Sequence, residues 1–159
     1  MSSAANGLLY TVNFDNVSIT NAAQDIWTFT AGTESILIHA IRITFVPTIT
    51  SGVPQDARAQ LRQLIRSTAG SGGSAVTPRA QNPRNTVASL ATVSRTTTTP
   101  GTAGNVMDSD QISIVLPYER VFTPAQRPFI PAATIWSLNL ENALGSAFNA
   151  SSTIWFEEL

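Results

Sequence analysis

The chain has 159 residues, a length typical of one domain and sufficient to bury a hydrophobic core. Apolar residues make up 43% of it and charged residues only 12%, with a formal net charge of −1, no lysine and no cysteine. These values argue against a protein that neutralises nucleic-acid phosphates or holds a polybasic membrane contact, and they exclude disulfides and thiolate metal sites. We therefore expect neither nucleic acid nor a membrane among its partners.

The N-terminal part predicts a short tail followed by a strand. Residues 1–7 lack the basic segment and apolar core of a signal peptide, so we interpret them as a tail. Residues 8–14 alternate between apolar and polar side chains, which is the pattern of a half-buried strand. Asp15 and Asn16 then predict a turn, with a short strand after it.

The next two strands contain the first tryptophan and the single histidine. Trp27 and Phe29 lie two residues apart and predict one apolar face of a strand. Residues 35–46 are apolar on both faces, as expected of a central, covered strand. We expect His39 to be packed there or at an interface. On a regular strand its face also holds Leu37, Ile41 and Ile43.

The middle of the chain contains an ambiguous segment and a loop. In residues 57–66 the arginines recur every four residues, which fits a helix, but the apolar residues also fit a strand. We favour the strand because the flanking segments are strand-like. Residues 69–85 are rich in glycine, serine and proline and predict a flexible loop. Strands are expected over 86–96 and 110–116, with a flexible tip between them.

The C-terminal part predicts two further strands after an irregular connection. Four prolines between Pro117 and Pro131 argue against a central strand there. Residues 133–141 alternate cleanly, with Ser137 and Asn139 expected to face solvent. The inward set of that strand is Thr134, Trp136, Leu138 and Leu140. The last strand covers residues 152–157.

This order of elements predicts an all-β fold. Eight or nine strands separated by turn signals, with no helix, favour an antiparallel β-sandwich of the jelly-roll kind. We expect residues 1–159 to form a single domain.

No residue pattern in the chain predicts catalysis. His39 stands without a Gly-x-Ser-x-Gly nucleophile elbow. Asp108 and Asp110 are two possible calcium ligands, but the rest of a binding loop is missing, and a solvated strand entry is favoured. Glu157 and Glu158 are adjacent on a strand and point to opposite faces, which makes them a poor acid–base pair. We predict a protein that is no enzyme, with no cofactor and no metal.

The three tryptophans have three possible roles. Trp27, Trp136 and Trp155 each lie in an apolar, alternating context, so core packing is favoured. Burial at an interface and a platform for a sugar ring are the alternatives.

Residues 117–131 are the candidate subunit contact. The segment combines prolines with aromatic residues and arginines, a composition enriched at interfaces. The candidate contact residues are Tyr118, Arg120, Phe122, Arg127, Phe129 and Ile130. The alternative is that the segment caps its own sandwich.

Three segments carry a resemblance to a known family. They are the strand running into residues 67–79, the segment Arg127–Pro131 before a strand, and the terminal stretch Thr153–Glu158. The chain resembles small tailed-phage virion proteins of jelly-roll type, the capsid decoration or cement proteins. The resemblance implies a protein made in the host cytoplasm that sits on the outer surface of the capsid. It also implies a homotrimer that clamps neighbouring copies of the major capsid protein, with no catalytic residues to transfer.

Two other functions stay open. A tail, baseplate or receptor-binding component also uses β domains, and a carbohydrate-binding jelly roll uses the same fold. A shell-forming coat protein is less favoured, because such proteins often carry a basic arm and residues 1–20 contain no arginine or lysine.

Overall fold

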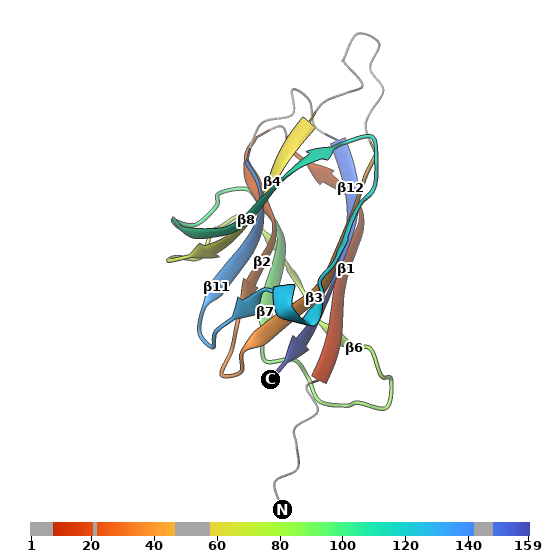
Figure 1. The fold of residues 1–159 in the computed structure, drawn as a ribbon, viewed down its shortest axis with the longest axis vertical. Helices are drawn as coiled ribbons and strands as arrows, with labels where there is room; N and C mark the ends of the chain where they lie inside the picture. Colours follow the sequence, from red (N-terminus) through yellow and green to blue (C-terminus); the bar gives the residue numbers. More distant parts are fainter. Residues whose placement is uncertain (1–7, 21, 47–57, 142–147) are drawn as a thin grey trace, which may run out of the picture.

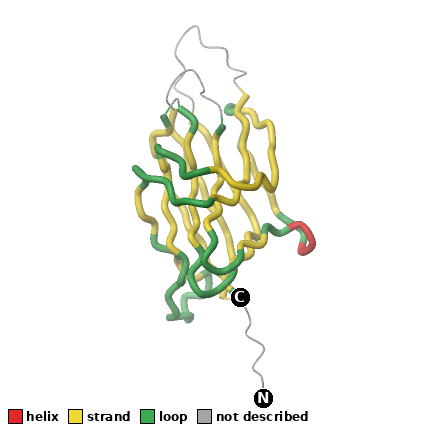
Figure 2. Tube along the Cα trace, turned by 90° about the vertical axis from the view of Figure 1, so that its left-hand side faces the viewer, coloured by secondary structure: helices red, strands yellow, loops and turns green. Residues whose placement is uncertain are grey.

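The computed structural model describes residues 8–20, 22–46, 58–141 and 148–159, in which twelve strands form two antiparallel sheets (Figure 1). Sheet A consists of β1 (Leu8–Ile19), β3 (Ile36–Val46), β6 (Arg79–Ala80), β9 (Tyr118–Val121), β10 (Phe129–Ile130) and β12 (Phe148–Glu158). Sheet B consists of β2 (Gln24–Thr30), β4 (Arg58–Arg66), β5 (Ser74–Val76), β7 (Thr92–Thr97), β8 (Ala103–Ser113) and β11 (Ile135–Leu140). One short 3-10 turn, η1 (Pro124–Gln126), projects from the strands in Figure 2.

The strand pairing is that of a jelly roll. Four antiparallel pairs are nested within one another along the chain, β1 with β12, β2 with β11, β3 with β9 and β4 with β8. The nested pairs are those of one long hairpin. Two further pairings, β12 with β3 and β11 with β4, link these pairs into two sheets. The predicted all-β antiparallel sandwich is therefore confirmed.

The predicted number of strands, eight or nine, was too low. The residues expected to form two strands, 8–14 and 17–19, are one strand, and residues 58–66 form β4 as favoured. The four unpredicted strands are β5, β6, β9 and β10, each two to four residues long. They lie in segments rich in glycine or proline, where the period-two signal is too short to recognise.

Several other boundaries differ from the sequence prediction. β7 begins at Thr92, so residues 86–91 are irregular, and β8 runs from Ala103 to Ser113 through part of the expected tip. β12 begins at Phe148, four residues before the expected start. The tail 1–7, the strand end at Pro47 to Pro54 and most of the turn at 142–149 lie outside the described residues.

Two bulges explain why simple alternation failed in β1 and β3. In β1 the register with β12 shifts between Phe14 and Val17, and Asn16 has a φ of 50°, so the expected turn is a bulge within one strand. In β3, Ala40 pairs with Trp155 and Ile38 with Phe156, which leaves His39 as the extra residue.

The bulge at His39 changes which side chains share a face. Ile36 and Ile38 before it, and Ile41 and Ile43 after it, are all buried in the core. His39 is therefore on the opposite side from Ile41 and Ile43, contrary to the prediction.

Aromatic side chains fill the core between the two sheets. Trp27 packs against Phe14 with ring centroids 5.0 Å apart, and Phe29 makes edge contacts with both Trp136 and Phe156. These rings come from both sheets and hold them together through burial and edge-to-face geometry. The predicted core packing is confirmed for Trp27 and Trp136, which are fully buried.

A two-stranded ribbon, residues 67–73 with residues 98–102, joins β4 and β8 to β5 and β7. Ser67 donates to the Thr102 carbonyl, and Ser71 pairs with Thr99, so the ribbon prolongs the β4–β8 ladder. The ladder resumes where β5 pairs with β7. Because β7 lies beside β2 and β4 beside β11, the ribbon passes from one flank of the β2–β11 pair to the other.

The ribbon covers a buried polar cluster on the side of sheet B that faces away from the core. The Arg66 guanidinium donates to the Gly101 carbonyl in the ribbon at 2.7 Å, to Ser137 Oγ at 2.8 Å and to the Asp25 carboxylate. Asn139 donates to Asp25 at 2.8 Å. Ser137 and Asn139, expected to face solvent, are buried in this cluster.

The glycine-rich segment 69–85 therefore contains regular structure that its composition did not predict. β5 and β6 lie within it, and residues 69–73 belong to the ribbon. A Cβ atom at Gly101 would lie 1.9 Å from the Thr68 carbonyl oxygen. The two segments of the ribbon therefore approach too closely at this position for any residue other than glycine.

Candidate functional site

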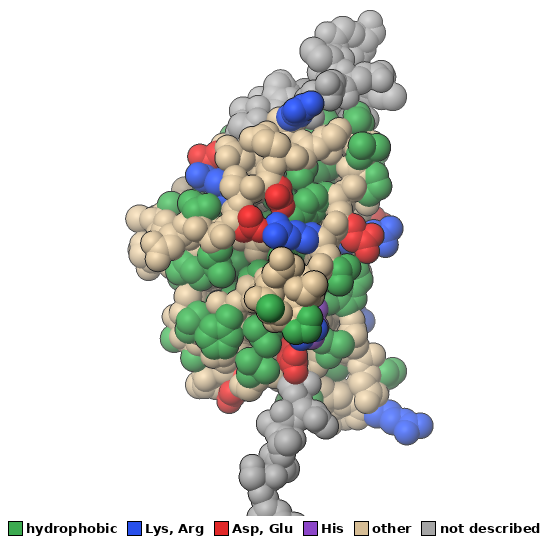
Figure 3. Space-filling model, viewed as in Figure 1, with side chains coloured by type: hydrophobic (Ala, Val, Ile, Leu, Met, Phe, Trp, Pro, Cys, Tyr) green, Lys and Arg blue, Asp and Glu red, His purple; other side chains and the backbone are tan. Residues whose placement is uncertain are grey.

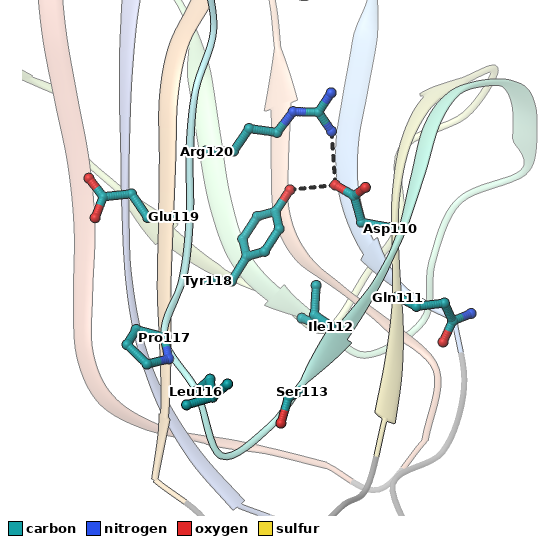
Figure 4. A pocket seen from close by; sticks show the side chains of 9 residues that line it. All are labelled: Asp110, Gln111, Ile112, Ser113, Leu116, Pro117, Tyr118, Glu119 and Arg120. Atoms are coloured by element: carbon teal, nitrogen blue, oxygen red, sulfur yellow. Dashed lines mark hydrogen bonds and ion pairs between the residues drawn. The ribbon is translucent and has the colours of Figure 1, made fainter.

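Residues 117–130 close one edge of the sandwich. β9 pairs with β3 in sheet A, while its inward side chains reach β8 at the edge of sheet B. Tyr118 donates to Asp110 at 2.7 Å, and Arg120 donates to Asp110 at 2.8 Å (Figure 4). Arg120 also pairs with Asp108. We call these four residues the edge cluster. It joins the two sheets where no strand pairing does.

The edge cluster replaces the solvated strand entry expected at Asp108 and Asp110. Both carboxylates bind the Arg120 guanidinium, which also stacks on Phe122 with its carbon 4.9 Å from the ring centre. Burial raises the pKa of the Tyr118 phenol, and its hydrogen bond to Asp110 raises that pKa further. Tyr118 therefore stays protonated at neutral pH and remains a donor.

A pocket with a volume of about 400 Å³ opens beside the edge cluster. Its walls carry the Tyr118 ring and polar side chains, and Leu116 lies at the opposite end from Arg120 (Figure 4). Val115 and Leu116 form the β8–β9 turn and are 46% and 64% exposed. Two adjacent, exposed, apolar residues at a turn have no role in the core, and we call them the apolar turn.

A second, smaller pocket of about 240 Å³ lies between β8 and residues 122–129. Phe122, Phe129 and Met107 supply its apolar wall. The Gln63 Oε1 and Arg127 Nε atoms of its lining are buried without a hydrogen-bond partner in the described residues.

The six predicted contact residues separate into four groups. Phe122 and Ile130 are buried in the core of their own chain, so they have almost no surface to offer a partner. Tyr118 and Arg120 belong to the edge cluster, and Arg127 lines the smaller pocket. Phe129 is 49% exposed. Contact with a partner through this segment stays a prediction.

Phe129 belongs to a larger apolar surface on the outer side of sheet A. It pairs with Leu37 across β10 and β3, and Val121, 71% exposed, pairs with Ala40 across β9 and β3. The next pair of these two strands on the same face is Arg42 with Glu119, both exposed. We call these six residues the open patch. Figure 3, which views the molecule from the same side as Figure 1, shows that charged side chains are few on that side of the molecule.

Trp155 and His39 lie next to the open patch rather than in the core. Trp155 is half-buried and pairs with Ala40, so the prediction of core packing is wrong for this tryptophan. His39 Nε2 lies 2.9 Å from the Glu157 carboxylate, and both side chains are about one-fifth exposed, at 23% and 21%.

Glu157 and Glu158 point to opposite faces as predicted. Glu158 is buried and accepts hydrogen bonds from Ser89 Oγ and from the main-chain nitrogens of Leu90 and Ala91. This carboxylate anchors the irregular residues 86–91, a role that the sequence did not signal.

The sequence contained only part of the information needed to find the open patch. The two-faced apolar pattern of 35–46 indicated cover on both sides, but the pairing of Val121 and Phe129 with that strand is a long-range contact. In the described ranges, no three histidine, aspartate or glutamate side chains are grouped as metal ligands. No helix in the same part of the chain is long and apolar enough to cross a membrane.

No protein-family model and no curated protein matches this sequence. Among solved structures, a mutant VP2 protein of infectious bursal disease virus is similar at 14% identity and a TM-score of 0.19, over 100% of this chain and 42% of that chain. The VP2 subviral particle of the same virus is similar at 14% identity and a TM-score of 0.18, over 100% and 43%. The chain thus spans less than half the length of these VP2 chains. TM-scores this low transfer neither a fold nor a function.

Proposed function

We propose that the protein is a structural, non-enzymatic component of a virion, a decoration protein that binds the major capsid protein on the outside of a phage head. The sequence resemblance supports this role. The jelly-roll pairing is compatible with it, because viral capsid and lectin domains both use this fold.

The observation that carries the proposal is the apolar turn beside the larger pocket. Leu116 is 64% exposed, whereas the nearby Tyr118 side chain is held by its hydrogen bond to Asp110, which also accepts from Arg120. A rigid wall next to exposed apolar side chains is suited to protein binding, because little conformational entropy is lost on contact. We place the capsid contact at this corner.

Binding to empty shells tests the proposal. Shells of the source phage assembled without this protein are mixed with purified protein and sedimented. We expect the protein to sediment with the shells, and Leu116→Ser to weaken binding roughly ten- to a hundredfold. Leu90→Ser is the matched control, because Leu90 is also an exposed leucine, 54% exposed, on residues 86–91.

The result also separates the other functions. No sedimentation with shells contradicts the proposal, and equal binding by the Leu116 and Leu90 variants contradicts the placement of the contact. Binding to tail structures instead indicates a tail or baseplate component. Binding to a soluble glycan, lost on Trp155→Ala, indicates the carbohydrate-binding alternative, which the half-exposed Trp155 favours.

A further inference from the structure

We infer that the open patch binds a second copy of this chain through a two-fold axis that runs parallel to the strands, midway between β3 and β9. The inference rests on strand register and charge and does not depend on the proposed function. It concerns a different surface from the apolar turn. The two-fold dimer differs from the homotrimer that the sequence resemblance implies.

The apolar part of the open patch is complementary to itself about this axis. When two copies pack face to face about this axis, β3 of one copy lies opposite β9 and β10 of the other. Residues that pair in register within one chain then lie opposite each other between the two copies. Ala40 then faces Val121 of the second copy, and Leu37 faces Phe129. In each case the more exposed side chain of one copy meets the less exposed one of the other.

The charged pair of the open patch fixes the position of the axis. Arg42 and Glu119 are neighbours in register, both exposed, and no ion pair of either is found among the described residues. With the axis between β3 and β9, each Arg42 faces the Glu119 of the other copy. The four side chains then form a square of alternating charge.

Other face-to-face arrangements are less favourable. An axis along β3 itself brings the two Arg42 side chains together, and like charges in contact cost several kcal/mol. An axis perpendicular to the strands places Arg42 over Leu37, which buries a charge on an apolar surface without a partner. A surface with one cation and one anion beside apolar rows is the composition that a second identical copy complements.

A charge-swap series tests the inference. We expect purified protein at micromolar concentrations to have the mass of a dimer by light scattering and sedimentation. Arg42→Glu and Glu119→Arg each place like charges opposite one another twice, so each should weaken the dimer by about tenfold or more. The double variant restores opposite charges and should return the dimerisation constant to within about threefold of the original.

The control is Arg79→Glu, which reverses the same charge on the same side of sheet A. Arg79 is exposed on β6 and pairs with Thr11, with β1 and β12 between it and β3. This variant should dimerise like the original chain. A monomeric or trimeric mass for the original chain overturns the inference. So does a double variant no better than the single ones, or an Arg79 effect equal to that of Arg42.

Discussion

The two outer faces of the sandwich differ in what they expose to solvent. On sheet B, the ribbon covers Arg66 and Asp25, which are 5% and 0% exposed. On sheet A, the open patch leaves Val121 and Phe129 about half exposed or more. Polar groups are thus enclosed on one side, and apolar groups are in water on the other.

This contrast separates stability from recognition. On the covered face, hydrogen bonds among Arg66, Asp25, Ser137 and Asn139 and to the ribbon offset the cost of burial, although Asp25 Oδ2 and Asn139 Oδ1 have no partner among the described residues. The open patch contributes little to folding because its side chains are already hydrated in the single chain. Substitutions on the covered face should therefore change unfolding, and substitutions on the open patch should change association.

The largest effect is expected from Asp25→Ala. The change leaves the Arg66 guanidinium buried without its carboxylate, and breaking a buried pair in this way costs about 3–5 kcal/mol. Urea unfolding measures the loss. Glu141→Ala is the control, because it removes an ion pair with Arg62 that is partly exposed and should cost under about 1 kcal/mol. Equal losses for the two variants would mean that the covered face has no special role.

A smaller effect is expected from shortening the ribbon. Composition alone predicts that deleting Gly72 and Gly73 changes the melting temperature little. In the structure these residues lie between the Ser71–Thr99 bridge and the β5–β7 ladder, so the deletion shifts one pairing against the other. We expect a loss of about 2 kcal/mol, or a melting temperature lower by roughly 4–8 °C. An unchanged melting temperature would restore the view of a free loop.

The ribbon also marks the limit of what the sequence could predict. The strands at 8–14, 35–46 and 133–141 were found because an alternating pattern, or an apolar run on both faces, is a property of the local sequence. The burial of Ser137 depends instead on Arg66, which also donates to the Gly101 carbonyl, and these residues are close only after folding. A glycine-rich composition cannot distinguish a mobile loop from a segment whose backbone packs closely against another segment of the same chain.

The candidate site was predictable to a similar extent. Aromatic residues and arginines drew attention to 117–131, and Phe129 and Tyr118 do lie at surfaces or pockets. The pattern could not show that Phe122 and Ile130 point inward. The pattern also could not show that Val121 belongs to the open patch, because that assignment depends on its pairing with Ala40.

Alkaline pH should test the contribution of the two tyrosines to stability, of which Tyr118 belongs to the edge cluster. Burial raises the pKa of Tyr10, as does the charge of Glu158, and the pKa of Tyr118 is raised as well. The ordinary tyrosine value is 10.0, so the stability from these groups is complete below about pH 10 and is lost as the pH rises further. The chain has two tyrosines and no lysine or cysteine, so few other side chains titrate there.

Tyr118→Phe separates the two tyrosines. The variant loses the hydrogen bond to Asp110, at about 1 kcal/mol near neutral pH, and should lose less stability than the original chain as the pH rises above 10. Unfolding in urea at each pH provides the measurement. An unchanged pH dependence would show that Tyr118 ionises without cost in the folded chain.

The smallest effect on folding is expected from Val121→Ser on the open patch. Val121 is 71% exposed, so the exchange should change the free energy of unfolding by no more than about 0.5 kcal/mol at concentrations where the chain is monomeric. Val12→Ser is the matched control, because Val12 is 1% exposed on the core side of the same sheet and should lose about 2 kcal/mol or more. At higher concentration Val121→Ser should weaken the dimer, because it removes apolar contact with Ala40 of the second copy. A large loss of stability in the monomer would mean that Val121 supports the fold, and the contrast between the two faces would then fail.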